Sequence, residues 1–141
     1  MKRIFFYSTA LLLLFVACSK DKQTLTDNTW QVESLKVHAD SAWQDPFVSE
    51  SGEKEPLTLS FRNKYNYSVT FRLAGCGGKV KYRPKHGIIF ESGGCTTIGG
   101  DSQLAWNFYE ILVAQINHYA LNDNKLTLTG DNGETINLIK Q

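Results

Sequence analysis

The sequence has little of what most enzymes and metal sites require. Three histidines and three cysteines are spread singly over 141 residues, whereas a zinc site needs four clustered ligands, commonly with C-x-x-C or H-x-x-x-H spacing. No G-x-S-x-G elbow, H-E-x-x-H helix, P-loop or dinucleotide glycine motif is present. We therefore expect a protein that is not an enzyme and has no cofactor and no metal. The one catalytic alternative is carboxylate chemistry, if Glu91, Asp101 and Glu110 meet in space.

A hydrophobic run long enough to cross a bilayer is missing as well. The apolar stretch covers residues 4–17 with three polar interruptions, whereas a transmembrane helix takes about 20 apolar residues. Lys2 and Arg3 precede it and small residues follow it, which is typical of an export signal. The stretch ends in FVAC and resembles the lipobox of bacterial lipoproteins, with Cys18 as the acylated residue. The alternative is an ordinary secreted protein with a chance cysteine at this place.

The lipobox resemblance implies cleavage after residue 17 and three acyl chains, palmitate among them, on Cys18. Two or more chains make a stable anchor in a lipid bilayer. Ser19, in place of Asp, goes with the outer membrane in Gram-negative envelopes. The polar segment after Cys18 lacks periodicity. We therefore expect a lipoprotein signal peptide at residues 1–17, an acylated cysteine with a flexible tether at residues 18–27, and an outer-membrane location in the bacterial cell envelope.

The mature chain has no excess of charge of one sign. Of 15 Lys and Arg residues, Lys2 and Arg3 leave with the signal, so that 13 basic residues remain against 14 acidic ones. This balance gives no global field that would attract nucleic acid. Removal of 17 residues from 141 leaves 124, the size of one domain with a substantial core. We place this domain at residues 28–141.

Two cysteines remain once Cys18 serves as the anchor. Cys76 and Cys95 would lie in an oxidising compartment, where an even pair is most simply a disulfide. Two free buried thiols, or a metal-binding or catalytic cysteine, are the alternatives. A disulfide closing this loop of about 20 residues would stabilise the fold by about 3 kcal/mol.

Most of the mature chain is predicted to be β-strand, because apolar residues alternate with polar ones over short runs bounded by turn residues. A first strand begins near Trp30. Three strand pairs follow, at residues 57–61 with 65–73, 80–82 with 88–90, and 125–130 with 134–139. The glycine in the DNG turn of the last pair supplies the positive φ that such turns need.

Residues 101–116 break this alternation. Apolar side chains, with Gln115 at the end, fall at i, i+4, i+7, i+8 and i+11 from Leu104, which is one face of a helix. We expect Asp101 to cap the helix and Asn117 to stop it. A helix among antiparallel strands indicates the α+β class. We expect a mostly antiparallel β-sheet curled into a half-barrel around this one helix.

The order of these features resembles the META domain family, which includes the heat-inducible lipoprotein HslJ. The resemblance spans residues 28–139 and rests on Trp30, the Gly-Cys pair at 75–76, the segment CTTIGG at 95–100, and the terminal hairpin at 118–130. It implies a small half-barrel with one helix, found on envelope lipoproteins linked to stress tolerance, and no established catalytic residues.

Two positions depart from the family pattern. Gly77 stands where the family has asparagine, and Gly100 stands about where many members have their second cysteine. Cys95 lies five residues before that second position.

One part of the sequence is strongly basic. Between Glu55 and Glu91 there is no acidic residue, while the basic ones are Arg62, Lys64, Arg72, Lys79, Lys81, Arg83 and Lys85. The last four are predicted to share one strand face. The simpler interpretation is a solvated outer face, and the functional one is contact with anionic lipid head groups, lipopolysaccharide or polysaccharide.

Large apolar residues also occur in polar surroundings. The loop at residues 38–56 carries Trp43 and Phe47; they either fold back onto the domain or contact a partner, since long loops are often functional. Trp106, on the polar side of the predicted helix, is expected to pack under a neighbouring loop.

Two functional hypotheses follow. The first is a membrane-anchored, non-catalytic envelope domain that binds an envelope protein or polysaccharide and supports envelope stress tolerance. The alternative is a periplasmic enzyme inhibitor or a carrier of a small apolar ligand.

Overall fold

The computed structural model describes residues 25–26, 28–45, 56–96 and 103–141. The predicted signal peptide, Cys18, Phe47 and the Asp101 cap lie outside these residues. The described elements are β1 (Thr29–Lys36), β2 (Thr58–Asn63), β3 (Asn66–Thr70), β4 (Gly75–Arg83), β5 (Gly87–Thr96), α2 (Gln103–Ala114), β6 (Ile116–Asn122), β7 (Lys125–Gly130) and β8 (Thr135–Lys140).

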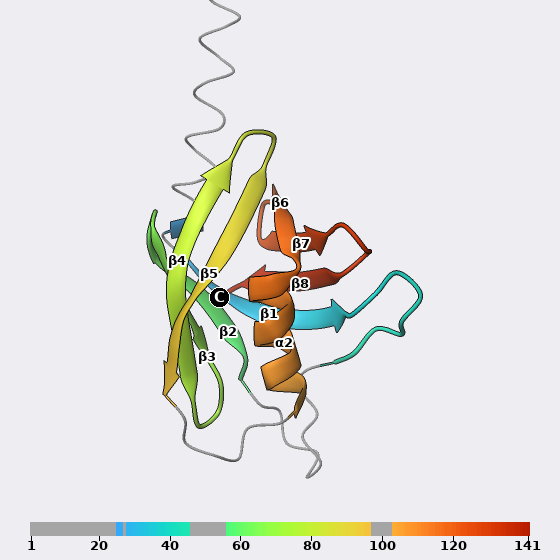
Figure 1. The fold of residues 1–141 in the computed structure, drawn as a ribbon, viewed down its shortest axis with the longest axis horizontal. Helices are drawn as coiled ribbons and strands as arrows, with labels where there is room; N and C mark the ends of the chain where they lie inside the picture. Colours follow the sequence, from blue (N-terminus) through green and yellow to red (C-terminus); the bar gives the residue numbers. More distant parts are fainter. Residues whose placement is uncertain (1–24, 27, 46–55, 97–102) are drawn as a thin grey trace, which may run out of the picture.

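The strands form a closed ring (Figure 1). Each strand pairs antiparallel with the next, and β8 pairs back onto β1. The predicted strand pairs are present as β2–β3, β4–β5 and β7–β8. The mostly antiparallel sheet with one helix predicted from the sequence is therefore confirmed for the described residues.

The ring is weakest between β5 and β6, where Gly87 and His118 are the one strand pair recorded. α2 packs against both of these strands, and Figure 1 shows it beside β5, with β6 continuing from its upper end. The helix thus covers the part of β5 that β6 does not pair with. On its other edge, β5 remains paired with β4 along its whole length.

The core is formed by the strand residues that point into the ring, which alternate with outward residues, and by the buried face of α2. Trp30, Tyr67, Phe90 and Phe108 are among the largest fully buried side chains, and each such burial contributes about 1.5–3 kcal/mol. Leu25, which the sequence placed in the tether, is also fully buried. Its carbonyl accepts a hydrogen bond from Trp30 Nε1 at 3.4 Å, so the folded part begins earlier than residue 28.

The predicted helix is present but shorter at its C-terminal end. Its apolar face is buried as expected, with Phe108, Ile111 and Leu112 in the core. The expectation that Asn117 stops the helix is wrong, because α2 ends at Ala114 and Asn117 already belongs to β6. Gln115 is the turn between them, and its N–H donates to Ile111 O at 3.0 Å.

Candidate ligand groove on the outer face of β2 to β5

The outer face of β2, β3, β4 and β5 is built from three transverse rows of small or polar residues. The strand registers align Asn63, Asn66, Lys79 and Glu91 in the first row, Ser60, Ser68, Gly77 and Gly94 in the second, and Thr58, Thr70, Gly75 and Thr96 in the third. Alternate residues of these strands, such as Phe61, Val69 and Val80, point inward and are buried. The outer surface is consequently polar and has few large side chains.

A groove of about 1140 Å³ lies in this surface. Its lining comes from all four strands and includes Arg62, Asn66, Gly77, Lys79 and Thr70. The floor follows β4, where glycines replace side chains. On one side of β4 the lining comes from β2 and β3, and on the other side it comes from β5. We call this hollow the β4 groove.

The glycines around the groove are of two kinds. A Cβ on Gly78 would lie 1.9 Å from Glu91 O, and one on Gly93 would lie 2.7 Å from Gly77 O, so close backbone packing at the bulge between β4 and β5 requires both. A Cβ on Gly75 or Gly77 would lie 3.3 or 3.1 Å from the nearest atom, a neighbouring-strand carbonyl oxygen. A side chain at either position would fit if the neighbouring strand shifted by a few tenths of an ångström.

Hydrogen-bond donors border the groove on the β2 and β4 sides. Arg62 and Lys79 are exposed, and neither forms an ion pair with another described residue. Asn63 Oδ1 accepts from Tyr65 N at 2.8 Å and Asn66 N at 2.9 Å, and also from Asn66 Nδ2. Because its oxygen is used in this way, the Asn63 side chain offers its NH₂ group to a ligand.

The predicted basic face is present on β4, with one correction. Lys79, Lys81 and Arg83 alternate along the strand and are exposed. Lys81 Nζ forms an ion pair with Glu91 Oε1 on β5. Lys85 does not share this strand face, because β4 ends at Arg83 and Lys85 lies in the turn to β5.

That turn has an uncommon backbone for its residues. Lys85 and His86 have φ values of 57° and 59°, the left-handed region that normally favours glycine or asparagine. Gly87 N–H donates to Pro84 O at 3.2 Å and closes the turn. The turn therefore holds a cationic side chain beyond the end of the strand at a cost in backbone energy.

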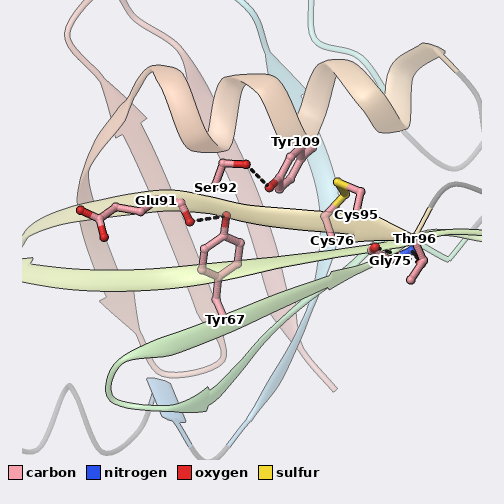
Figure 2. The surroundings of a disulfide bond; sticks show 8 residues. All are labelled: Tyr67, Gly75, Cys76, Glu91, Ser92, Cys95, Thr96 and Tyr109. Atoms are coloured by element: carbon pink, nitrogen blue, oxygen red, sulfur yellow. Dashed lines mark hydrogen bonds between the residues drawn. A yellow bond between two sulfur atoms is a disulfide. The ribbon is translucent and has the colours of Figure 1, made fainter.

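The disulfide joins Cys76 and Cys95 directly across β4 and β5, with Cα atoms 4.0 Å apart. Figure 2 shows the sulfur atoms on the side of the strands that faces α2, while both cysteines also count among the residues that line the groove. Cys76 is buried, whereas Cys95 is exposed. The disulfide therefore cross-links two of the strands that line the groove.

A small group of hydroxyls lies beside the disulfide on the inner side (Figure 2). Tyr67 OH donates to Glu91 O at 3.4 Å, and Ser92 Oγ lies 3.1 Å from Tyr109 OH on α2. Burial raises the pKa of Tyr67 far above its usual value, and its interaction with Tyr109 acts in the same direction. Tyr67 thus stays protonated and acts as a hydrogen-bond donor that holds the bulge.

Trp43 and Trp106, the two described aromatic residues singled out in the sequence, differ in their surroundings: Trp43 is exposed and Trp106 is packed against another ring. Trp43 is 53% exposed, and Lys36 Nζ lies 5.8 Å from the centre of its ring. Trp106 packs edge-on against Phe71, with ring centres 5.2 Å apart. Phe71 follows β3 and lies outside regular structure, in accord with the expected packing of Trp106 under a loop.

Sequence reasoning missed Glu134, which is only 1% exposed. Its Oε2 accepts from Asn132 N at 2.9 Å, its Oε1 accepts from Asn132 Nδ2 at 3.2 Å, and His38 Nδ1 lies 3.9 Å from Oε1. Burial alone would raise the pKa of this carboxyl, but hydrogen bonds from its own backbone and from Asn132, with the His38 charge, lower it overall. The carboxylate organises the turn between β7 and β8.

The groove was also missed as a site, although several of its residues were noted individually. The signal that could have found it is the combination of Gly75 and Gly77 in a strand with Ser and Thr at the outward positions of the neighbouring strands. The carboxylate cluster suggested in the sequence analysis includes Asp101, which lies outside the described residues. Glu91 pairs with Lys81, Glu110 is exposed on α2, and Asp101 is not described.

In residues 25–26, 28–45, 56–96 and 103–141, no three His, Cys, Asp or Glu side chains are grouped so that they could hold a metal ion. Over the same ranges, no helix has both the length and the apolar character needed to cross a membrane.

The comparisons with known proteins concern the fold. The sequence matches no protein-family model and no curated protein. Its structure is similar to the NMR structure of a protein from Burkholderia xenovorans, with a TM-score of 0.62 and 18% identity over 85% of this chain and 86% of that one. It is also similar to the crystal structure of a DUF4847 family protein from Bacteroides vulgatus, with a TM-score of 0.58 and 12% identity over 84% of this chain and 95% of that one. At these identities the likeness shows a shared fold.

Proposed function

We propose that this chain is a lipoprotein of the bacterial cell envelope whose non-catalytic domain binds an anionic envelope polymer through the outer face of β4. Acylation of Cys18 would anchor it in the outer membrane, and binding would support the envelope under stress. We also propose that the ring of strands, with α2 between β5 and β6, is a form of the half-barrel that the META resemblance implies.

The observation that carries this proposal is the distribution of charge on β4. Lys79 and Arg83 are exposed on the same face as Lys81, whose ammonium group forms an ion pair with Glu91 on β5. The pairing partly neutralises that acid, so the face as a whole stays cationic. Lys85 in the following turn extends the cationic surface past the end of the strand.

The backbone of the turn supports a role for its side chains. Strained non-glycine residues persist where the surrounding structure holds them, and they are common at functional sites. Lys85 and His86 both occupy the left-handed region, where glycine would be easier to accommodate. Contact of the Lys85 and His86 side chains with a ligand would account for keeping these residues at positive φ despite the cost in backbone energy.

The test compares two variants with the same loss of charge in the full-length protein held in detergent micelles. Arg83→Gln with Lys85→Gln removes two cations from the proposed surface, and Lys125→Gln with Lys140→Gln removes two exposed cations from β7 and β8. Retention on lipopolysaccharide-coated beads is measured at about 50 and 300 mM NaCl, since salt screens exposed charges.

At about 1 kcal/mol per cation near an anionic surface, the first variant should lose up to about 30-fold in affinity at low salt. The difference should shrink at high salt, and the control variant should stay close to the wild type. Equal retention of the two variants would show that the β4 surface has no special part in binding.

The second candidate function is inhibition of a periplasmic enzyme by the loop around Trp43. Its half-exposed ring is the observation that favours this candidate. A carrier of an apolar ligand is less well supported, because Phe90, Phe108 and Leu112 fill the space between sheet and helix. Trp43→Ala should leave lipopolysaccharide retention unchanged if β4 is the binding surface.

A further inference from the structure

The floor of the β4 groove has glycine at two positions, Gly75 and Gly77, where the backbone conformation would also accept another residue. Gly75 and Gly77 are not among the residues with positive φ, and a Cβ at either would need a shift of only a few tenths of an ångström. A glycine inside a strand costs about 0.5–1 kcal/mol relative to alanine. Such glycines often mark a place where a ligand approaches the backbone closely.

The rim of the groove carries two cations and one acid, Glu91, whose carboxylate is already paired with Lys81. Arg62 and Lys79 supply two cations without protein partners among the described residues. Asn63 and Asn66 offer amide groups, and Thr70 offers a hydroxyl group. Arginine binds a carboxylate through two parallel hydrogen bonds, whereas lysine acts as a point charge.

The groove does not suit the other common classes of ligand. An extended peptide binds by adding a strand to a free sheet edge, but β4 is paired on both sides, with β3 and with β5. A lipid chain needs apolar contact, but the outward residues of the three rows are small, polar or charged. Hydroxyl-rich ligands match the amide, hydroxyl and charged groups that remain.

We propose that the β4 groove binds a short acidic saccharide. Its sugar rings lie over Gly75 and Gly77, and its carboxylate lies between Arg62 and Lys79. Four residue steps along the strand, from Gly75 to Lys79, span about 13 Å, the length of about two or three linked pyranose rings. The inference rests on the proposed function because both require an anionic ligand. It goes further by assigning a saturable binding site, the β4 groove, next to the cationic face of β4.

The probe is a galacturonic acid trisaccharide, and its methyl ester is the neutral match. Binding to the full-length protein in detergent micelles is measured by isothermal titration. Gly77→Thr fills the floor with a residue that strands accept well. Arg62→Gln removes one exposed cation of the rim, and Lys125→Gln removes an exposed cation from β7 as the control.

The acid trisaccharide should bind with one-to-one stoichiometry, and its ester at least about tenfold more weakly, a difference of about 1.4 kcal/mol. Gly77→Thr and Arg62→Gln should each weaken binding at least about tenfold, while Lys125→Gln should not. Circular dichroism confirms that Gly77→Thr is folded. If Gly77→Thr does not fold, the test rests on Arg62→Gln and on the methyl ester. No saturable binding, or equal binding by Arg62→Gln and Lys125→Gln, overturns the inference.

The variant Arg83→Gln with Lys85→Gln separates this inference from the proposed function. It should reduce retention on lipopolysaccharide yet leave trisaccharide affinity unchanged, because neither residue lines the groove. Loss of retention without any trisaccharide binding by the wild type would overturn the groove inference alone. Trisaccharide binding with unaltered retention of that variant would overturn the proposed surface and support the groove.

Discussion

Replacing Glu134 by Gln is expected to lower the free energy of unfolding by about 1.5–3 kcal/mol, the usual contribution of one hydrogen bond to a charged group. The carboxylate accepts two hydrogen bonds from Asn132, one from the backbone and one from the side chain. Gln keeps the shape and one acceptor oxygen. Its NH₂ group, however, must face one of the two donors of Asn132.

The pH dependence of this effect follows from the lowered pKa of Glu134. The carboxyl has a pKa below its reference value of 4.5 in the folded protein, because the hydrogen bonds and the His38 charge outweigh the effect of burial. The folded state then binds fewer protons here than the unfolded state does. The stabilisation is complete above the unfolded pKa and is lost as the pH falls through the folded pKa.

Urea unfolding of the wild type and Glu134→Gln at about pH 7 and about pH 3 measures this difference. The gap between the two proteins should be large near neutral pH and smaller in acid, because only the wild type loses the carboxylate on acidification. Asp131→Asn is the control, since it removes an exposed carboxylate from the same turn. A gap that stays constant with pH, or one no larger than that of Asp131→Asn, would refute the reasoning.

Three further predictions concern the anchor, the disulfide and the β4–β5 turn. Cys18→Ser should release the protein from the membrane fraction, and unchanged partition after an alkaline wash would contradict acylation. Cys76→Ala should lower the free energy of unfolding in urea by about 2–5 kcal/mol; an unchanged midpoint would mean that the cross-link adds no stability. Lys85→Asn with His86→Gly should raise stability by about 1–2 kcal/mol, because both suit positive φ, and a lower midpoint would argue against strain in the turn.

The elements that the sequence predicted well are those with one buried face. Leu59 and Phe61 alternate with polar residues because β2 faces the core on one side and solvent on the other. The face of α2 that carries Phe108 and Leu112 has the helical spacing for the same reason. Closure of the ring between β1 and β8 could not be predicted, because it depends on the tilt and register of all eight strands together.

The candidate site was only partly predictable, because a groove depends on the register between strands. The sequence shows Gly77 and Lys79 two residues apart, but it does not show that Asn66 lies opposite Lys79 or that Ser68 lies opposite Gly77. Lys85 was placed on the wrong surface because alternation was continued into a turn with left-handed residues.

The burial of Glu134 was also beyond the sequence, because it depends on a contact between distant segments. Gly133 has a φ of 86°, and a Cβ there would lie 2.6 Å from the Cβ of Ala39. Ala39 N–H also donates to Asn132 O at 3.1 Å. The segment after β1 therefore docks on the turn and covers the carboxylate.

The central claim is that the outer face of β2 to β5 is the binding surface of this protein. Backbone amide chemical shifts of the labelled full-length protein in micelles, followed during titration with the acidic trisaccharide, test it most directly. The account predicts saturating shifts at Arg62, Asn66, Gly77 and Lys79, with little change elsewhere. Shifts centred on Trp43 and its neighbours, with the β4 amides unmoved, would contradict the account.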